Sequence, residues 1–553
     1  MSARSTMTGG QALAAQLALE CVDTVFGIPG LQIYHAVDGL GTHAPGIDFI
    51  TTRHEQATAY MADGYARASG KPGVCLVVPG PGVLNILAAL STAYACSSPV
   101  LAICGQLATS AIGRDNGALH EINRQSDTLK TVTKWHAIAR AAEEIPALVR
   151  EAMVQLSTGT PRPVALEIPP DILAQEAEVC LVPVLDQPER RTPAPLPGEL
   201  AALRSEIDAA QRPVLVVGGG CRNGRAGEAI AGLATRIGAP IALTANGLGS
   251  VPADHPLALG TLAGKMAIAQ ADLLIGIGTR FIGRSGPFGG SGAEHGARVA
   301  LINTETAAFR EPRVPDLAIK ADATVAAEAL LESFSAPAAP SWPQDGAHEE
   351  LVQRCATWRA EAQSRIEAGI APQLEYLRAL QQAIPRDAVV VGEYTQLSYA
   401  AQLGFDFFTG SGTITPGYQG TLGYGYATAL GAAVGQPGRA VVSVNGDGGF
   451  GWTLAELATA RQYDIPVVAI VADDGAYGNV QRDQKAQFEG RAYGSQLRNP
   501  DFVALAGAFG IAASRAASPE ELGEQVAAGI AAREPRLIHL PVPTFPTPWP
   551  LLA

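Results

Sequence analysis

The chain has 553 residues, more than one hydrophobic core can organise, so we expect about three domains. Hydrophobic residues make up 47% of the chain, which is typical of a compact folded protein and not of a disordered one. The net charge of -13 argues against nucleic acid or an anionic membrane as a partner, because both are bound by clustered Lys and Arg.

The seven cysteines are scattered and include no C-x-x-C pair, which excludes an obvious disulfide framework or zinc site. The chain does not open on a basic segment followed by an apolar one, and it contains no apolar run long enough to span a membrane. We therefore expect a cytoplasmic protein.

Strand-like apolar runs alternate with helix-like stretches, which predicts an α/β fold of three successive domains with mainly parallel sheets. The expected domains are residues 1–184, a central Rossmann-like α/β domain at 195–334, and residues 347–553. The segments 185–199 and 335–346 are rich in Pro and read as linkers. The predicted strands lie in VDTVFGIPG, IDFITTRHE, GVCLVVPGPG, SPVLAICGQ, RPVALEIPPD, RPVLVVGGG, APIALTANG, ADLLIGIGT, ARVALINTE, DAVVVGE, GRAVVSVNGDGG, IPVVAIVADD and PRLIHLPVP.

A strand of the third domain runs directly into Gly446-Asp447-Gly448-Gly449, and the next predicted strand ends at Asp474. Parallel sheets bind ligands beyond the carboxyl ends of their strands, so both carboxylates would meet at one edge. With the carbonyl of Ala476, water and phosphate oxygens, they would complete the all-oxygen shell that Mg²⁺ prefers. The alternative is a turn in which Asp447 only caps the following helix.

Glu55 stands at the junction between a predicted strand and an amphipathic helix. A carboxylate at a helix N-terminus stabilises the helix by about 0.5–1 kcal/mol, so a capping role is the simpler interpretation of this residue alone.

Taken together, GDGGF followed by DDGAYG and the block RHEQAT…ADGYAR resemble the motifs of thiamine-diphosphate-dependent enzymes. The usual second metal element ends in Asn-Asn, whereas this chain has Asp473-Asp474, which still offers an oxygen ligand. The resemblance implies that Glu55 hydrogen-bonds the cofactor pyrimidine, whose imino form then removes the proton from thiazolium C2.

The resemblance covers essentially the whole chain and implies further contacts with the cofactor. The Gly420 carbonyl and the Leu422 backbone N–H would bind the aminopyrimidine, and the Leu422 side chain would wedge between the two cofactor rings. The other implied contacts are Pro29, Gly30, Gly80, Asn85, Val391, Gly392, Glu393, Tyr394, Gly446, Asp447, Gly448, Gly449, Asp474, Ala476, Tyr477 and Gly478. Members of this family complete each site across a subunit interface, which implies a homodimer or homotetramer.

The layout is most similar to the acetolactate synthase, pyruvate oxidase and benzoylformate decarboxylase group. We therefore expect a lyase or transferase acting on a 2-oxo acid or a related carbonyl compound, by carboligation first and by simple decarboxylation second. A flavin-linked oxidase and a catalytically silent regulatory subunit are further alternatives. FAD is possible but disfavoured, because the loop LALGTLAGKMAIAQADLL looks shorter than the flavin-contacting loop of acetolactate synthases.

Two departures from the acetolactate synthases concern the substrate side. The segment from Gly478 to Asp483 lacks the tryptophan that these enzymes carry, and NGALHEINRQSD replaces their Phe-Gln-Glu segment. The latter places His120 near the thiazolium, where it could shuttle protons at neutral pH. Gln106, which ends the strand LAICGQ, is a further catalytic candidate.

Overall fold

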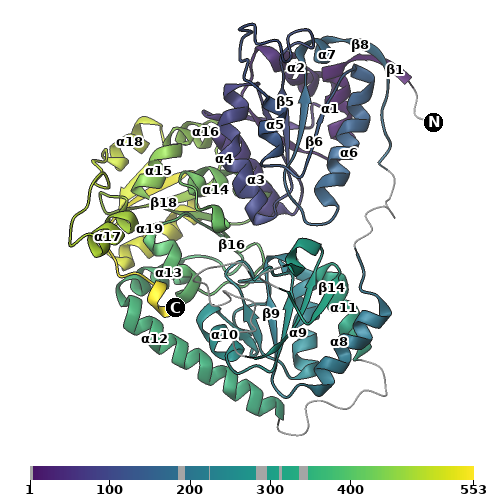
Figure 1. Ribbon diagram of the computed structural model, residues 1–553. Helices are drawn as coiled ribbons and strands as arrows, with labels where there is room; N and C mark the ends of the chain where they lie inside the picture. Colours follow the sequence, from purple (N-terminus) through teal and green to yellow (C-terminus); the bar gives the residue numbers. More distant parts are fainter. Residues whose placement is uncertain are drawn as a thin grey trace.

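The computed structural model of the protein describes residues 4–184, 193–222, 224–281, 296–310, 314–334 and 347–552. Three α/β domains follow one another along the described chain, each built on a parallel sheet of six strands, which confirms the predicted fold class (Figure 1). Residues 185–192 and 335–346, which belong to the two predicted linkers, lie outside the described residues. No helix in the described ranges is both long and apolar enough to cross a bilayer.

The first domain has the strand order β3-β2-β4-β5-β7-β6, and a short antiparallel pair, β1 with β8, joins its two ends. Its central strands are buried and apolar throughout, as expected for a parallel sheet covered by helices on both faces. The elements are β1 (Arg4–Thr8), α1 (Gly9–Leu19), β2 (Thr24–Gly27), η1 (Leu31–Ile33), α2 (Tyr34–His43), β3 (Asp48–Thr51), α3 (Glu55–Ser69), β4 (Gly73–Val77), α4 (Pro81–Cys96), β5 (Val100–Gly105), α5 (Gln125–Lys130), β6 (Trp135–Ile138), η2 (Ala142–Glu144), α6 (Ile145–Ser157), β7 (Val164–Ile168), α7 (Pro170–Ala174) and β8 (Glu176–Cys180).

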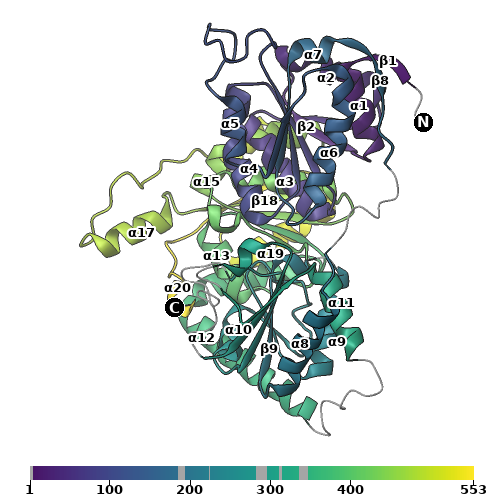
Figure 2. The same ribbon diagram turned by 45° about the vertical axis from the view of Figure 1, so that its right-hand side comes forward.

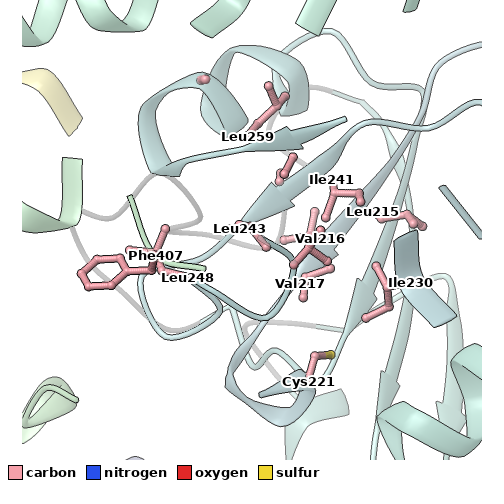
Figure 3. Close-up of a cluster of buried hydrophobic side chains, with 14 of the residues drawn as sticks. Leu215, Val216, Val217, Cys221, Ile230, Ile241, Leu243, Leu248, Leu259 and Phe407 are labelled. Atoms are coloured by element: carbon pink, nitrogen blue, oxygen red, sulfur yellow. The ribbon is translucent and has the colours of Figure 1, made fainter. Parts of the chain in front are cut away.

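The central domain has the order β11-β10-β9-β12-β13-β14, and its core extends into the third domain. In Figure 3, Phe407 of the third domain lies beside Leu248, at the margin of the cluster formed by strands β9 and β10. The elements are α8 (Pro197–Ala209), β9 (Pro213–Val217), η3 (Gly219–Cys221), α9 (Gly224–Ile237), β10 (Ile241–Leu243), β11 (Ala258–Leu259), α10 (Thr261–Ile268), β12 (Leu273–Ile277), β13 (Arg298–Asn303), η5 (Thr306–Phe309), β14 (Leu317–Lys320) and α11 (Ala323–Ser333).

The third domain has the order β16-β15-β17-β18-β20-β19, and a long helix, α12, leads into it. This helix is kinked at Ile370, two residues before Pro372, because proline cannot be accommodated in a straight helix. The elements are α12 (Ala347–Ala383), β15 (Val389–Gly392), α13 (Gln396–Gly404), β16 (Thr413–Ile414), η6 (Gly417–Gln419), α14 (Tyr424–Gly435), β17 (Val441–Gly446), α15 (Asp447–Thr453), η7 (Leu454–Glu456), α16 (Leu457–Gln462), β18 (Val467–Asp473), α17 (Gly478–Gln487), α18 (Phe502–Ala508), β19 (Ala512–Arg515), α19 (Pro519–Ala532), β20 (Arg536–Pro541) and α20 (Trp549–Leu552).

Helix α3 of the first domain packs directly against helix α14 of the third (Figure 1), and the turned view again shows α3 at the boundary with the third domain (Figure 2). Two glycines allow the close approach. A methyl group at Gly64 would overlap the carbonyl oxygen of Thr428, and one at Gly431 would overlap that of Met61. One hydrophobic cluster therefore crosses the domain boundary. The sequence positions that flank this helix pair are those of the candidate site.

Candidate active site

Glu55 is the first residue of α3 and is half-buried. Its carboxylate accepts a hydrogen bond from the side-chain amide of Asn85, with 2.9 Å between Asn85 Nδ2 and Glu55 Oε2. Helix α3 has another cap, since the ring nitrogen Nδ1 of His54 accepts a hydrogen bond from Gln56 N–H. The simple capping role considered for Glu55 is therefore filled by its neighbour, and the Glu55 carboxylate is oriented by Asn85.

The turn at Gly80 separates Glu55 from His120. Gly80 has φ 59°, a left-handed conformation that favours glycine, and a methyl group there would also overlap the His120 carbonyl. A methyl group on Gly82 would lie 3.8 Å from Glu55 Cγ. Two of the three predicted catalytic residues, Glu55 and His120, thus flank one turn. The Nδ1 atom of His120 is buried and has no hydrogen-bond partner in the protein, so it is available to a ligand.

The loop after β2 meets the same region. The Gln32 amide donates a hydrogen bond to the Leu119 carbonyl at 3.1 Å, and a methyl group on Gly30 would overlap the side chain of Val78. Pro29 is exposed beside them. The structure therefore brings the predicted first-domain residues together at the carboxyl edge of their sheet.

Gln106, in contrast, is turned into the domain interior. It is buried, its amide nitrogen donates to Glu167 at 2.5 Å, and its amide oxygen accepts from Leu107 N–H. Glu167 is completely buried on β7 and also accepts hydrogen bonds from Gln125, Ser126 and His136. These bonds lower the pKa of Glu167 although burial alone would raise it. The geometry gives Gln106 a structural role.

In the third domain, Asp447 is the first residue of helix α15, so the helix begins within the GDGG motif and not after it. The Asp447 side chain is 4% exposed, and its carboxylate accepts a hydrogen bond from Asn499 at 2.6 Å. Asn499 also donates to Asp473 at 2.7 Å. Burial, together with the nearby charges of Asp474 and Asp473, raises the pKa of Asp447 to about 6.

The two adjacent aspartates at the end of β18 have different partners. Asp473 is held by His539, by Gly475 N–H and by Asn499, and these bonds lower its pKa against the effect of burial. Asp474 accepts a hydrogen bond from Gln396 at 2.9 Å, and burial raises its pKa. The two aspartates therefore differ in their partners: Asp473 is held by three protein groups, whereas Asp474 accepts a side-chain hydrogen bond from Gln396.

The strand end from Val391 to Tyr394, which is predicted to contact the cofactor, is largely buried. Val391 and Gly392 are buried in the sheet, and the Tyr394 hydroxyl donates to the carbonyl of Gly417. The Glu393 side chain is 2% exposed and accepts from Gly423 N–H at 2.7 Å, while its Oε2 atom has no partner. Burial raises the pKa of Glu393 to about 7.

Close packing within the protein requires glycine at two positions of the GDGG motif. A methyl group on Gly448 would lie 2.6 Å from the Tyr477 ring, and one on Gly449 would overlap the Glu393 carboxyl group. The first turn of α15 has no side-chain cap from Gly446, although Gly448 N–H, one of its backbone N–H groups, donates to the Asp447 carboxylate. Such groups at a helix N-terminus bind phosphate readily.

The turn before α14 lies against this helix start. Gly420 has φ 62°, and a methyl group there would lie 3.3 Å from the Tyr394 ring. Leu422 is half-buried and belongs to none of the hydrophobic clusters of the described residues. Ala476, Tyr477 and Gly478 follow β18, and Tyr477 N–H donates to the Ser495 carbonyl at 2.8 Å. The predicted third-domain residues thus also form one group.

Sequence reasoning missed four side chains that organise these two groups. Asn499 and Gln396 bind the aspartates, Glu167 holds the first-domain loops, and Glu456 contacts the backbone before Glu55. Gln396 lies three residues after a predicted strand segment, Glu167 lies within one, and Glu456 follows the GDGG motif by seven residues. No local pattern indicates which partners these side chains bind.

Strand-end loops and a helix N-terminus at the edges of two parallel sheets are typical of α/β enzymes that bind a phosphorylated organic cofactor. Residues 7–128 match the N-terminal TPP binding domain of thiamine pyrophosphate enzymes, residues 200–330 their central domain, and residues 391–540 their C-terminal TPP binding domain.

Full-length relatives agree with these matches. The chain is 36% identical to a probable 2-ketoarginine decarboxylase of Pseudomonas aeruginosa, over 98% of this chain and 95% of that protein. It is 33% identical to a probable acetolactate synthase large subunit of Methanocaldococcus jannaschii, over 97% of this chain and 92% of the relative. It is 32% identical to the acetolactate synthase isozyme 2 large subunit of Escherichia coli, over 99% and 97% of the two chains.

The chain belongs to the thiamine pyrophosphate enzymes. The predictions of an enzyme and of thiamine diphosphate as its cofactor are confirmed.

Proposed function

We propose that this enzyme releases CO₂ from a 2-oxo acid, with Glu55 as the residue that activates the cofactor. The observation that carries the proposal is the half-exposed Glu55 carboxylate, which Asn85 orients at the first turn of α3. When bound, thiamine diphosphate supplies a thiazolium carbon that accepts electron density from the cleaved bond. A relative described as a 2-ketoarginine decarboxylase supports the 2-oxo acid class.

Glu55 is tested by Glu55→Gln, which keeps the shape of the side chain and removes its charge. We expect turnover of 2-oxo acids to fall by about 100-fold or more, because general acid–base groups contribute about 10²–10⁴-fold. The exposed Glu143→Gln is the control and should behave as the native enzyme. Unchanged turnover in Glu55→Gln would remove this residue from the mechanism.

We propose that His120 donates or accepts a proton on the substrate side. Its partnerless buried Nδ1 and its place beside the Gly80 turn support this role. His120→Asn should lower kcat by about 100-fold or more, because general acid–base groups contribute about 10²–10⁴-fold. A native kcat in this variant would argue against the assignment.

We propose that Mg²⁺ is held by Asp447, Asp474 and the Ala476 carbonyl. Crowded, partly desolvated carboxylates beside a helix N-terminus favour a hard cation with a diphosphate. In the part of the chain that the structure describes, no three His, Cys, Asp or Glu side chains are placed to hold a metal alone. The proposed shell therefore includes cofactor oxygens.

The metal assignment is tested by Asp447→Ala. The affinity for thiamine diphosphate should become weak and independent of Mg²⁺ in calorimetric titrations. The exposed Asp387→Ala serves as the control. Native Mg²⁺-dependent affinity in Asp447→Ala would refute the metal site.

We propose that a second copy of the chain completes each site. Large apolar side chains that flank the cofactor loops of both domains are exposed, which favours a protein interface. They are Leu31, Tyr34, Leu84, Leu119, Tyr418 and Trp452. Trp452→Glu should yield monomers in light scattering with little activity, whereas Tyr493→Ser, at an exposed aromatic residue outside this set, should stay dimeric or tetrameric.

Carboligation is the second candidate, because two of the relatives above are described as acetolactate synthases. The segment from Gly478 to Asp483 lacks their tryptophan, which is why we place decarboxylation first. A panel of 2-oxo acids, with and without aldehyde acceptors, separates the two reactions by the ratio of CO₂ to ligated product. The absorbance spectrum of the purified protein tests the disfavoured flavin.

A further inference from the structure

The backbone immediately before Glu55 is held by side chains of the third domain of the same chain. Thr51 N–H donates to the Tyr463 hydroxyl at 2.9 Å. Arg53 N–H donates to both carboxylate oxygens of Glu456, at 3.0 and 3.1 Å, and His54 N–H donates to Glu456 Oε1 at 3.0 Å. Three of the five residues from Thr51 to Glu55 therefore depend on this contact between domains.

Glu456 is built into that position. Its side chain is 1% exposed, although Arg53 and His54, whose N–H groups it accepts, are themselves exposed residues. The Thr459 hydroxyl donates to Glu456 Oε2 at 2.5 Å and fixes the carboxylate from its own domain. A buried carboxylate with two backbone donors and one hydroxyl donor has a single favourable orientation, because any rotation leaves a polar group unsatisfied.

The two N–H groups that donate to Glu456 belong to the residues one and two positions before Glu55. The peptide planes of Arg53 and His54 set the direction in which the chain enters α3, and Glu55 is the first residue of that helix. Without an acceptor, these N–H groups would turn toward water and carry the Glu55 backbone with them. An error of about 1 Å at a reacting group can cost about 100-fold in rate.

We propose that Glu456 is a positioning residue that fixes the Glu55 carboxylate from the third domain. The proposal rests on the role assigned to Glu55 under the proposed function. Glu456 touches neither substrate nor cofactor. Its effect passes through the two backbone N–H groups before α3.

Three variants at position 456 separate positioning from general stability. Glu456→Gln keeps one oxygen that can accept from both N–H groups, and its NH₂ group can donate to the Thr459 hydroxyl. Glu456→Leu removes both acceptors at similar volume, and Glu456→Asp keeps the charge but draws it back by one methylene. We expect kcat to fall by about 10–100-fold in the Leu and Asp variants and by less than about threefold in the Gln variant.

Two further variants are matched controls. Thr459→Val removes a partner of Glu456 but leaves both backbone bonds in place. Tyr463→Phe removes the acceptor of Thr51 N–H, which lies four residues from Glu55. Both should keep kcat within about threefold of the native value, even where the thermal midpoint falls.

Hydrogen–deuterium exchange supplies a readout that does not depend on turnover. In the cofactor-free protein, amide exchange of the peptide covering Thr51 to Ala57 should become faster in Glu456→Leu and Glu456→Asp. In Glu456→Gln it should remain as slow as in the native protein. If Glu456→Leu does not fold, Glu456→Asp carries the comparison.

The proposal is overturned if the Asp variant, or a folded Leu variant, turns over at the native rate. It is also overturned if the Gln variant is as impaired as either of them, or if exchange before α3 is unchanged. Glu55→Gln distinguishes the two levels of inference. Native turnover in Glu55→Gln refutes the proposed function itself, whereas an inactive Glu55→Gln beside a native-like Glu456→Asp refutes only the positioning role.

Discussion

Replacing Gly431 by alanine tests the contact between helices α3 and α14. The added methyl group would lie 2.5 Å from both the carbonyl carbon and the Cα atom of Met61. Carbon atoms in contact are about 3.5–4.0 Å apart, so the two helices would have to separate by about 1 Å. Both obstacles are backbone atoms, which no rotamer change can move.

Overpacking of this kind costs about 1–3 kcal/mol when side chains can adjust, and here we expect at least about 3 kcal/mol. The thermal midpoint of Gly431→Ala should therefore fall by several degrees. We also expect turnover to fall, because a displacement of α3 also displaces Glu55, the first residue of that helix. Differential scanning calorimetry and steady-state kinetics on the same preparations measure both effects.

Gly507→Ala is the matched control, since Gly507 lies in helix α18 and a methyl group there would meet no atom within 4 Å. Alanine is favoured over glycine in a helix by about 0.5–1 kcal/mol, so this variant should be as stable as the native protein or more so. Equal midpoints for the two variants would refute the close-packing argument.

Two more predictions concern buried carboxyl groups. Because burial raises the pKa of Glu393 to about 7 from 4.5, the folded state stays protonated over a range in which the unfolded state ionises. Native stability is therefore lost as pH rises from about 4.5 to 7, by about 3 kcal/mol from this group, and is constant above that. Glu393→Gln should remove this dependence of stability on pH. The test compares the thermal midpoints of the native protein and the variant at several pH values without cofactor. An equal pH dependence in the two proteins would refute the reasoning. Glu167→Ala should destabilise the first domain by about 3 kcal/mol or more, because four buried or half-buried donors lose their acceptor. The exposed Glu151→Ala should leave calorimetric unfolding unchanged, and a native midpoint in Glu167→Ala would contradict this prediction.

The central strands of all three sheets were predictable from sequence, and most of the edge strands were not. The predicted segments contain every interior strand, because a strand buried on both faces reads as an unbroken apolar run. The missed strands β6, β11, β14, β16 and β19 are all edges of the six-stranded sheets. Such strands are short or partly exposed and lack that signal, as Leu317–Lys320 illustrates.

The residues of the candidate site also differ in whether the local sequence indicates them. The sequence predicts roles for Glu55, Asp447 and Asp474 because each stands at the end of an apolar strand or the start of a helix, where local pattern carries information. It does not indicate Asn499 or Glu456, because their partners lie more than 25 residues away, Asp447 for the one and Arg53 for the other. For Gln106, a strand-end position does not reveal that the side chain turns inward to Glu167.

Asp447 is the first residue of helix α15, and Glu456 is the last residue of the short 3-10 helix η7 that follows it after a break at Thr453. The number of residues between them therefore sets where Glu456 lies. The insertion or deletion of one residue within α15 would rotate everything after it by about 100° around the axis of that helix and move Glu456 away from Arg53. This stretch should therefore tolerate substitution at its exposed positions but no change in length, which sets a firm limit for anyone who grafts loops between enzymes of this fold.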